Sequence, residues 1–276
     1  MELSTVHDGH MSINLTHRLV YFVPEAIEEY AALGVTGQAG YFGSRAAPLG
    51  AVPDQVVVAT FYNFSPGVIA GRMAKVWATT SPDAMQAARF RVVRRALHRV
   101  QAELSQDHLT EARALIDLVV EKLDLAGKPL AAANAALALP DDPQVALWQQ
   151  VTVLREWRGD VHIALLLTNE IGPCECLILQ VGTGRMSRFL VSSTRRWDDA
   201  EWAAATSNLV DRGWVEADGT LTDLGVRQRE RIEADTDRLC APIWTPIGDV
   251  GAARLGELLS PIHAAMDAAG TYAALA

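Results

Sequence analysis

The chain has 276 residues and a mass of 29.9 kDa, a length suited to one large domain or two ordinary ones. Hydrophobic residues make up 50% of it and charged residues 21%, which is typical of a globular protein and excludes disordered and collagen-like chains. The formal net charge of −9 argues against non-specific binding to nucleic acids or anionic membranes, because both depend on positive potential.

Cysteine usage and the longest apolar segment indicate the cellular compartment. Cys174, Cys176 and Cys240 are too few for a disulfide framework, and the first two are too close together for a zinc knuckle. We therefore expect reduced thiols, no metal and a cytoplasmic protein. The N-terminal segment does not resemble a signal peptide, and the apolar run 163–167 is far shorter than the roughly 20 residues of a membrane helix. No membrane partner is expected.

Helix-start signals recur along the chain, in the form of prolines or acidic residues followed by good helix formers. Later helices are expected to be amphipathic because their apolar residues recur at steps of three and four. The sequence predicts helices that begin within or cover these segments: 24–30, 82–99, 109–112, 143–157, 198–209, 221–239 and 250–269.

These features occur twice in the same order, starting near Pro24 and near Pro143. In the first copy, Ala46, Gly50 and Val56 have the spacing of a helix-turn-helix, which requires a small residue, a glycine and an apolar residue at these places. The second copy offers the same spacing at Thr168, Gly172 and Ile178.

The segment from Trp197 to Leu239 has the strongest local pattern. A helix is expected to end at Gly213, and Asp218-Gly219 between two short extended pieces is a hairpin signal. A new helix is expected from Asp223. Helix, tight hairpin and helix in this order predict a winged helix-turn-helix.

The sequence pattern of this segment resembles that of regulators of the MarR type. The chain as a whole resembles an actinobacterial family described as helix-turn-helix-containing, to which we assign no activity. The MarR resemblance implies a regulator that holds an aromatic or amphipathic effector between its dimerisation and reading parts. The segments that carry the resemblance to the actinobacterial family are Gly40–Pro48, Ala59–Phe64, Leu154–His162 and Arg212–Trp214.

We therefore expect a mainly α fold with small β-wings, made of two degenerate winged-helix repeats related by pseudo-two-fold symmetry. The expected boundaries are 17–128 for the first repeat, 129–245 for the second, and 246–276 for a C-terminal helix that packs on both. Such a pseudo-dimer is compatible with a monomer or with a homodimer.

DNA binding requires cations that face the phosphates and side chains that read bases. The expected helix 82–99 carries a basic face over residues 89–99. We favour a face that is paired with acidic residues of the second repeat. The alternative is a face that contacts phosphate. In the second repeat, the helix before the wing is rich in carboxylates, which argue against DNA. The candidate DNA-contacting residues are Arg91, Arg94, Arg95 and Arg99.

A crevice between two repeats is a favourable place for a small molecule, because pockets form at such interfaces and are lined by aromatic residues with a few polar groups. We expect a small, aromatic or amphipathic organic ligand there, and the sequence leaves any cofactor open. The candidate ligand-binding residues are Tyr41, Arg45, Tyr62, Trp157, Arg158 and His162.

An enzyme is the alternative. His162 is a candidate general base oriented by Asp160 or by Glu156, and Asp160 is expected to cap the helix that follows it. The competing interpretation is a structural network in which Arg155, Glu156 and Asp160 are ion-paired and His162 is a hydrogen-bonded core residue. No hydrolase elbow, zinc-protease or calcium-loop motif occurs in the chain.

Overall fold

The computed structural model describes residues 1–184 and 186–271, and these residues form fifteen α-helices and two short 3₁₀ helices. The N-terminal half contains α1 (Leu3–His17), η1 (Arg18–Tyr21), α2 (Pro24–Ala31), α3 (Gln38–Ala46), η2 (Ala47–Leu49), α4 (Asp54–Phe61), α5 (Pro66–Ile69), α6 (Arg72–Thr79), α7 (Pro82–Arg99) and α8 (Gln106–Val120). The C-terminal half contains α9 (Pro129–Ala135), α10 (Pro143–Thr168), α11 (Glu175–Gly182), α12 (Arg188–Arg195), α13 (Asp199–Asp211), α14 (Asp223–Trp244) and α15 (Gly248–Ala268).

The helices begin where local chemistry favours it. Proline occupies the first turn of α2, α7 and α10, where its missing N–H costs nothing. Asp198 forms a capping box with Glu201 at the start of α13, so that two otherwise unpaired N–H groups are satisfied. The helices predicted from these signals are confirmed. The N-terminal helix α1 was not predicted, because it has neither a proline nor an acidic residue in its first turn.

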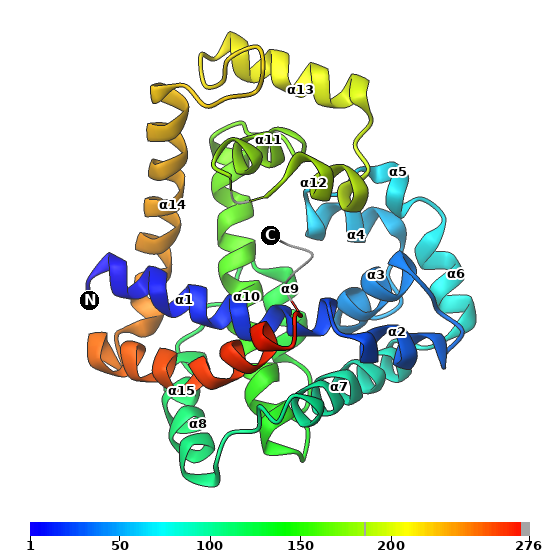
Figure 1. The fold of residues 1–276 in the computed structure, drawn as a ribbon, viewed down its shortest axis with the longest axis vertical. Coiled ribbons are helices and arrows are strands. Elements are labelled where there is room, and N and C mark those ends of the chain that lie inside the picture. The colour runs from blue at the N-terminus through cyan, green and yellow to red at the C-terminus, as the bar shows by residue number, and fades with distance from the viewer. Residues whose placement is uncertain (185, 272–276) are drawn as a thin grey trace.

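Helix α10 is the central element, as Figure 1 shows. It packs against α1, α8, α9 and α14, and α15 covers α1 and α8. Since α10 is surrounded, apolar residues lie on several of its faces, among them Trp148, Val151 and Leu154, each at most 1% exposed. Of the expected C-terminal segment 246–276, residues 272–276 lie outside the described residues.

Two smaller cores flank the central one. Phe42, Phe61 and Phe64 pack together where α3, α4 and the segment after α4 meet. Leu177, Leu209 and other apolar residues of α11–α14 form the second. In Figure 1, α11 lies at the upper end of α10, and α12 lies just above α4. Trp197 joins the two parts, because its indole N–H donates a hydrogen bond to the carbonyl oxygen of Asn63 (3.0 Å).

The expected β-wings and the fold of two winged-helix repeats are wrong. The described residues contain no strand or sheet, and the predicted hairpin provides only one isolated antiparallel bridge, between Val215 and Leu221. No ladder forms because the extended segments on either side of the turn are too short. Glu216 N–H donates to the Thr220 carbonyl (2.8 Å), so the turn begins directly after the bridge and leaves too few residues for a ladder. The mainly helical class stands.

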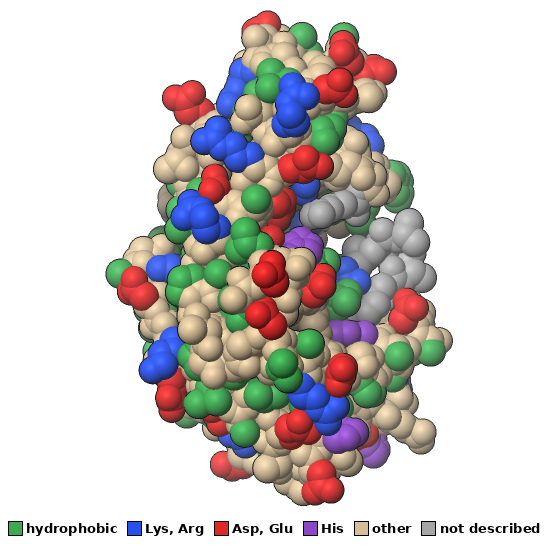
Figure 2. Space-filling model, turned by 90° about the vertical axis from the view of Figure 1, so that its left-hand side faces the viewer, with side chains coloured by type: hydrophobic (Ala, Val, Ile, Leu, Met, Phe, Trp, Pro, Cys, Tyr) green, Lys and Arg blue, Asp and Glu red, His purple; other side chains and the backbone are tan. Residues whose placement is uncertain are grey.

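The outer surface on the side of α14, α1 and α15 mixes charges of both signs. Figure 2 shows acidic and basic side chains interspersed over this face, with no continuous basic area in view. Among the residues described, none of the helices combines the length and the apolar character needed to cross a membrane.

Candidate functional site

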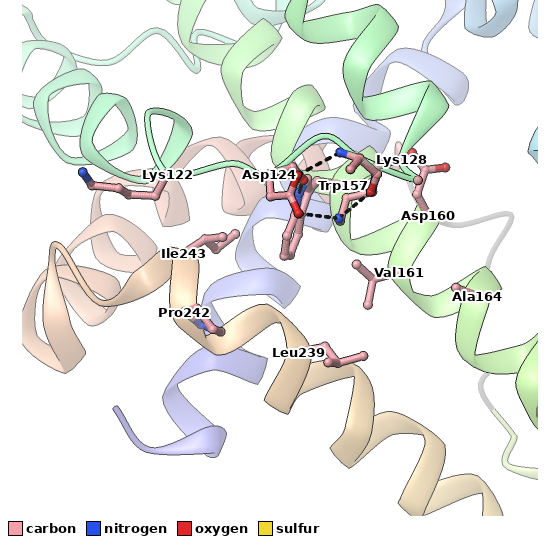
Figure 3. A pocket seen from close by; sticks show the side chains of 12 residues that line it. Lys122, Asp124, Lys128, Trp157, Asp160, Val161, Ala164, Leu239, Pro242 and Ile243 are labelled. Atoms are coloured by element: carbon pink, nitrogen blue, oxygen red, sulfur yellow. Dashed lines mark hydrogen bonds and ion pairs between the residues drawn. The ribbon is translucent and has the colours of Figure 1, made fainter.

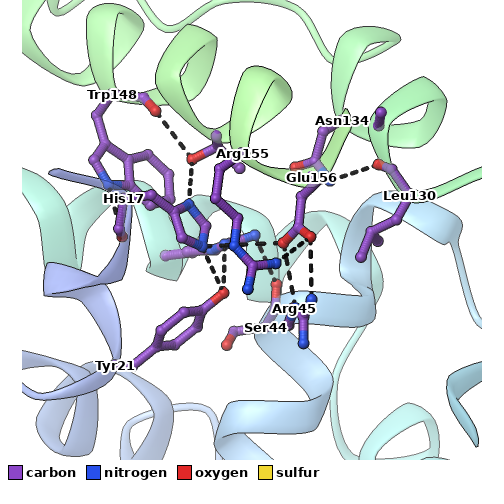
Figure 4. A network of polar contacts seen from close by, with 12 residues as sticks. His17, Tyr21, Ser44, Arg45, Leu130, Asn134, Trp148, Arg155 and Glu156 are labelled. Carbon is purple, nitrogen blue, oxygen red and sulfur yellow. Dashed lines mark hydrogen bonds and ion pairs between the residues drawn. The ribbon is translucent and has the colours of Figure 1, made fainter. Parts of the chain in front are cut away.

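The middle of α10 carries a buried ion-pair network. Glu156 is 2% exposed and accepts two hydrogen bonds from Arg45 of α3, from Nε to Oε1 (3.2 Å) and from Nη2 to Oε2 (3.0 Å). Arg155 Nη1 donates to the same Oε2 (2.5 Å). Burial acts to raise the pKa of Glu156, but the charges of Arg155 and Arg45 outweigh it and hold the pKa well below its usual range. One carboxylate is thus shared by two guanidinium groups (Figure 4).

A buried histidine extends this network to α1. His17 Nδ1 contacts the Thr152 hydroxyl (3.0 Å), and its Nε2 contacts the Tyr21 hydroxyl (2.9 Å). Burial, reinforced by the charge of Arg155, holds the pKa of His17 well below its ordinary value, so the ring stays neutral at pH 7. Arg89 of α7 is fully buried and donates to the Ser44 carbonyl (3.3 Å). The network therefore ties α1, α3, α7 and α10 together.

Three adjoining cavities surround this network, and Arg155 lines all of them. We name them the Arg195 cavity (about 550 Å³), the Tyr62 cavity (about 190 Å³) and the His10 chamber (about 210 Å³). The Arg195 cavity is bounded by α1, η1, α3, α10, the end of α11 and α12. Its described lining residues are Asn14, His17, Arg18, Tyr21, Phe22, Gly37, Gln38, Tyr41, Asn63, Phe64, Arg155, Gln180, Met186, Thr194 and Arg195.

The charge in the Arg195 cavity is one-sided. Three arginines line it, and no Asp or Glu stands among its described lining residues. Arg195 lies over the Phe64 ring, with its Cζ 4.3 Å from the ring centroid. Its Nε is buried without a hydrogen-bond partner, and within residues 1–184 and 186–271 it has no carboxylate partner. Burial lowers the pKa of Arg195, and the nearby charges of Arg45 and Arg155 act in the same direction. Such a group is suited to an incoming anion.

Tyr41 stands between the Arg195 and Tyr62 cavities and lines both. Arg45 Nη1 donates to its hydroxyl (3.3 Å). Burial acts to raise the pKa of Tyr41, but the charges of Arg45, Arg195 and Arg155 outweigh it, so the pKa lies below its ordinary value. The positive potential of the surrounding arginines thus lowers the pKa of the Tyr41 hydroxyl.

The structure brings together four of the six residues expected to bind a ligand. Tyr41, Arg45, Tyr62 and His162 line the Tyr62 cavity, and Tyr41 also lines the Arg195 cavity. The Tyr62 hydroxyl donates to the Ile171 carbonyl. Arg158 lies on another side of α10, where its Nη2 donates to Asp237 (2.7 Å).

Trp157, the sixth, lines a separate groove of about 460 Å³ between α10, α14 and the loop before α9 (Figure 3). Its indole N–H donates to the Asp124 carbonyl (2.8 Å), and Lys128 Nζ lies 5.2 Å from its ring centroid. Apolar side chains such as Val161 and Leu239 complete this groove. Trp157 therefore does not contact the arginine-lined cavities.

Asp160 and His162 have separate partners. Asp160 Oδ2 accepts from the backbone N–H groups of Leu130 (3.1 Å) and Ala131 (3.0 Å), and burial raises its pKa to about 6. It therefore caps α9, and α10 runs through position 160 without a break, so the expectation that Asp160 caps a following helix is wrong. His162 Nδ1 contacts the Thr236 hydroxyl of α14 (3.0 Å), and burial lowers the pKa of this ring.

The basic face of α7 is neutralised by carboxylates. Arg89 lies in the core, and the other arginines pair with α2 or with the residue before α10. The pairs are Arg91 with Glu29 (2.7 Å), Arg94 with Asp142 (2.7 Å), Arg95 with Glu28 (2.5 Å) and Glu29 (2.8 Å), and Arg99 with Glu25 (2.5 Å).

Sequence reasoning did not find Arg195, His17 or Tyr21. Arg195 belongs to a pair of arginines before Trp197 that looks like any solvated helix end, and the segment of His17 was not predicted to be helical. No local signal could have identified these residues, because their environment comes from segments far apart in the chain. Among the described residues, His, Cys, Asp and Glu do not gather in groups of three or more able to hold a metal ion.

Comparison with known proteins assigns the chain to a protein family. The model of the helix-turn-helix family matches residues 7–273, which is nearly the whole chain. The protein belongs to the helix-turn-helix family. Neither a curated protein nor a solved structure matches it.

Proposed function

We propose that this helix-turn-helix protein binds a small organic anion with an aromatic part in the Arg195 cavity. The observation that carries the proposal is Arg195 itself. The residue is half-buried, its Nε is buried without a hydrogen-bond partner, and it has no carboxylate partner among the described residues. Keeping a cation partly out of water is costly unless a counter-charge is present, and a bound carboxylate or sulfonate supplies one.

The rest of the cavity supports an aromatic ligand. Tyr21, Tyr41 and Phe64 line it, and their rings can contact a flat apolar group. Asn63 and Gln180 add uncharged polar groups that orient a ligand. A volume of about 550 Å³ is in the usual range for small-molecule sites, roughly 300–1,000 Å³.

Regulation is the use we propose for this binding. The cavity wall includes α12, which contacts the segments around α3 and α4 through a few polar bonds. Ser65 N–H donates to the Arg195 carbonyl (3.0 Å), and Gln38 Nε2 donates to the Thr194 carbonyl (3.1 Å). A ligand that bridges Arg195 and Tyr41 would hold these two parts together, so that its binding favours one arrangement of them.

A fluorescence titration with anilinonaphthalene sulfonate, an aromatic sulfonate, tests the proposal. Arg195→Gln should weaken binding at least about tenfold, because a charge-assisted hydrogen bond contributes about 1.5–3 kcal/mol. Arg196→Gln is the matched control, since Arg196 follows directly and is exposed. Equal affinities for the wild-type protein and both variants would overturn the proposal, provided that the variants unfold at similar temperatures.

Proton transfer on the same ligand is a second candidate, favoured by the raised pKa of Asp160, about 6, beside the Tyr62 cavity. Asp160→Asn keeps an acceptor for the α9 N–H groups but cannot transfer a proton. A turnover that this variant abolishes would favour an enzyme. DNA binding by the α7 face is less favoured, since its arginines are already paired. A gel shift whose affinity falls steeply with salt would support it.

A further inference from the structure

The His10 chamber lies between α1, α10 and α14, and Arg155 lines both it and the Arg195 cavity. His10 and Asn14 of α1 line it, together with Arg158 and His162. Most of its described lining residues are polar.

The protonation of His10 follows from its partner. The ring is 3% exposed, and the indole N–H of Trp244 donates to its Nε2 (2.9 Å). An indole nitrogen can only donate, so Nε2 must accept, and the proton of the neutral ring resides on Nδ1. Burial, with the charges of Arg158 and His7, holds the pKa of His10 well below its ordinary value. The ring is therefore a neutral donor at pH 7.

This donor has no acceptor within the described residues, because His10 Nδ1 is buried without a hydrogen-bond partner. Arg158 repeats the pattern on the same wall. Its Nη2 donates to Asp237 (2.7 Å) and Glu233 (3.3 Å), while its Nε is buried and has no partner. A buried donor left unpaired costs about 1–3 kcal/mol. Two buried donors at this chamber, His10 Nδ1–H and Arg158 Nε–H, thus lack an acceptor among the described residues.

The charge in the chamber indicates what kind of acceptor it takes. Arg158 is balanced by the two carboxylates that it contacts, and His7 Nδ1 contacts the second oxygen of Asp237 (3.1 Å). Arg155 is shared with Glu156. In contrast to the Arg195 cavity, this chamber has no uncompensated arginine, so an uncharged oxygen fits it better than a second anion.

The chamber and the Arg195 cavity share walls. Asn14 and Arg155 line both of them, and Gly159 and His162 are shared with the Tyr62 cavity. Gly159 lines both the chamber and the Tyr62 cavity, and a Cβ there would come 3.7 Å from Arg155 Nη1. Arg155 is partly exposed, at 28%, and is the main side chain at this junction.

We propose that the ligand of the Arg195 cavity extends past Arg155 into the His10 chamber, where an uncharged carbonyl oxygen of the ligand accepts a hydrogen bond from His10 Nδ1–H. The ligand class is an elongated aromatic acid with a ketone or amide in its tail. This inference rests on the proposed function, because the acidic end is assigned to Arg195.

The test compares two probes, a para-alkylbenzoate and a benzoate of equal length with a ketone in its tail, by calorimetric titration. A series of tail lengths brings the ketone to His10. In His10→Gln, the amide oxygen can still accept from Trp244, but the donor at the Nδ1 position is lost. At the best tail length, the ratio of ketone to alkyl affinity should fall about tenfold in this variant, as expected for one hydrogen bond. His98→Gln, on the exposed end of α7, should leave the ratio unchanged.

Nitrogen NMR of the wild-type protein tests the same contact without a substitution. The ketone probe should shift the His10 Nδ1–H resonance more than the alkyl probe does. Equal affinities and equal shifts at every tail length would mean that the chamber holds water only, and would overturn the inference while leaving the proposed function intact. Failure of both benzoates to bind in an Arg195-dependent manner would instead overturn the proposed function.

Discussion

The α7 face and the Arg195 cavity use the same residue type in opposite ways. On α7, each of Arg91, Arg94, Arg95 and Arg99 faces a carboxylate of a neighbouring segment. In the cavity, Arg45 and Arg155 share Glu156, and Arg195 has no carboxylate among the described residues. The arginines of the α7 face, which are close together in the sequence, are thus neutralised. The arginines of the Arg195 cavity, which are far apart in the sequence, leave uncompensated positive charge in the cavity.

Arginine density along the chain therefore does not indicate where an anion binds. The potential at a site depends on the carboxylates that face it, and these come from other helices. We make five predictions from this contrast, from the largest expected effect to the smallest.

The shared carboxylate should be the most costly residue to lose. Glu156→Ala removes the only carboxylate contact of Arg45 in the described structure, and truncating one partner of a buried ion pair costs about 3–5 kcal/mol. Urea unfolding measures the change. Glu257→Ala, on the exposed face of α15, is the control and should have little effect. A loss below about 1 kcal/mol for Glu156→Ala would contradict the central role of this pair.

Asp160 should act as a cap whose charge is unfavourable. Asp160→Asn keeps an acceptor for Leu130 and Ala131 and should be more stable than Asp160→Ala by about 1–2 kcal/mol, the usual contribution of a helix cap. Thermal unfolding of the two variants measures this difference. Equal stabilities would mean that the cap contributes nothing.

The same residue predicts a pH dependence. The pKa of Asp160 is raised in the folded protein to about 6, from 3.8. Its protonated form is thus favoured by folding, so its stabilising contribution is complete below pH 3.8 and is lost as the pH rises through about 6. Asp160→Asn should therefore gain stability relative to the wild-type protein over this interval. A constant difference between pH 3.8 and 6 would contradict it.

We expect the Arg195 side chain to lower the free energy of unfolding of the ligand-free protein. Arg195→Met removes a poorly compensated cation and keeps apolar contact with Phe64, so we expect a gain of about 1 kcal/mol in the free energy of unfolding. The same variant should lose the binding of anilinonaphthalene sulfonate. Chemical unfolding and titration together check both effects. A destabilised variant would indicate that Arg195 is paired in solution.

The smallest effect is expected on α7. Arg94 is 57% exposed, so Arg94→Ala should change the free energy of unfolding by less than about 1 kcal/mol. It should also leave the binding of anilinonaphthalene sulfonate unchanged. A loss of binding in a fluorescence titration would remove the contrast between the two groups of arginines.

The sequence by itself was enough to predict the resemblance to a helix-turn-helix family and these helices: α2, α7, α8, α10, α13, α14 and α15. Prolines in first turns, the Asp198 capping box and apolar spacing act within a few residues, so they can be identified locally. The turn at Asp218-Gly219 forms where it was predicted, but the predicted hairpin strands do not: a single bridge forms, and the local pattern does not show how many residues the turn uses.

Only the tertiary structure decided which charges are compensated. Asp160 reaches back to α9 rather than to its own helix, and α1 brings His17 and His10 to α10 over more than a hundred residues of chain. Four expected ligand residues meet at the Tyr62 cavity, whereas Trp157 and Arg158 face elsewhere on α10. Burial and electrostatic potential are sums over neighbours from the whole chain, and spacing along one segment contains no information about those neighbours.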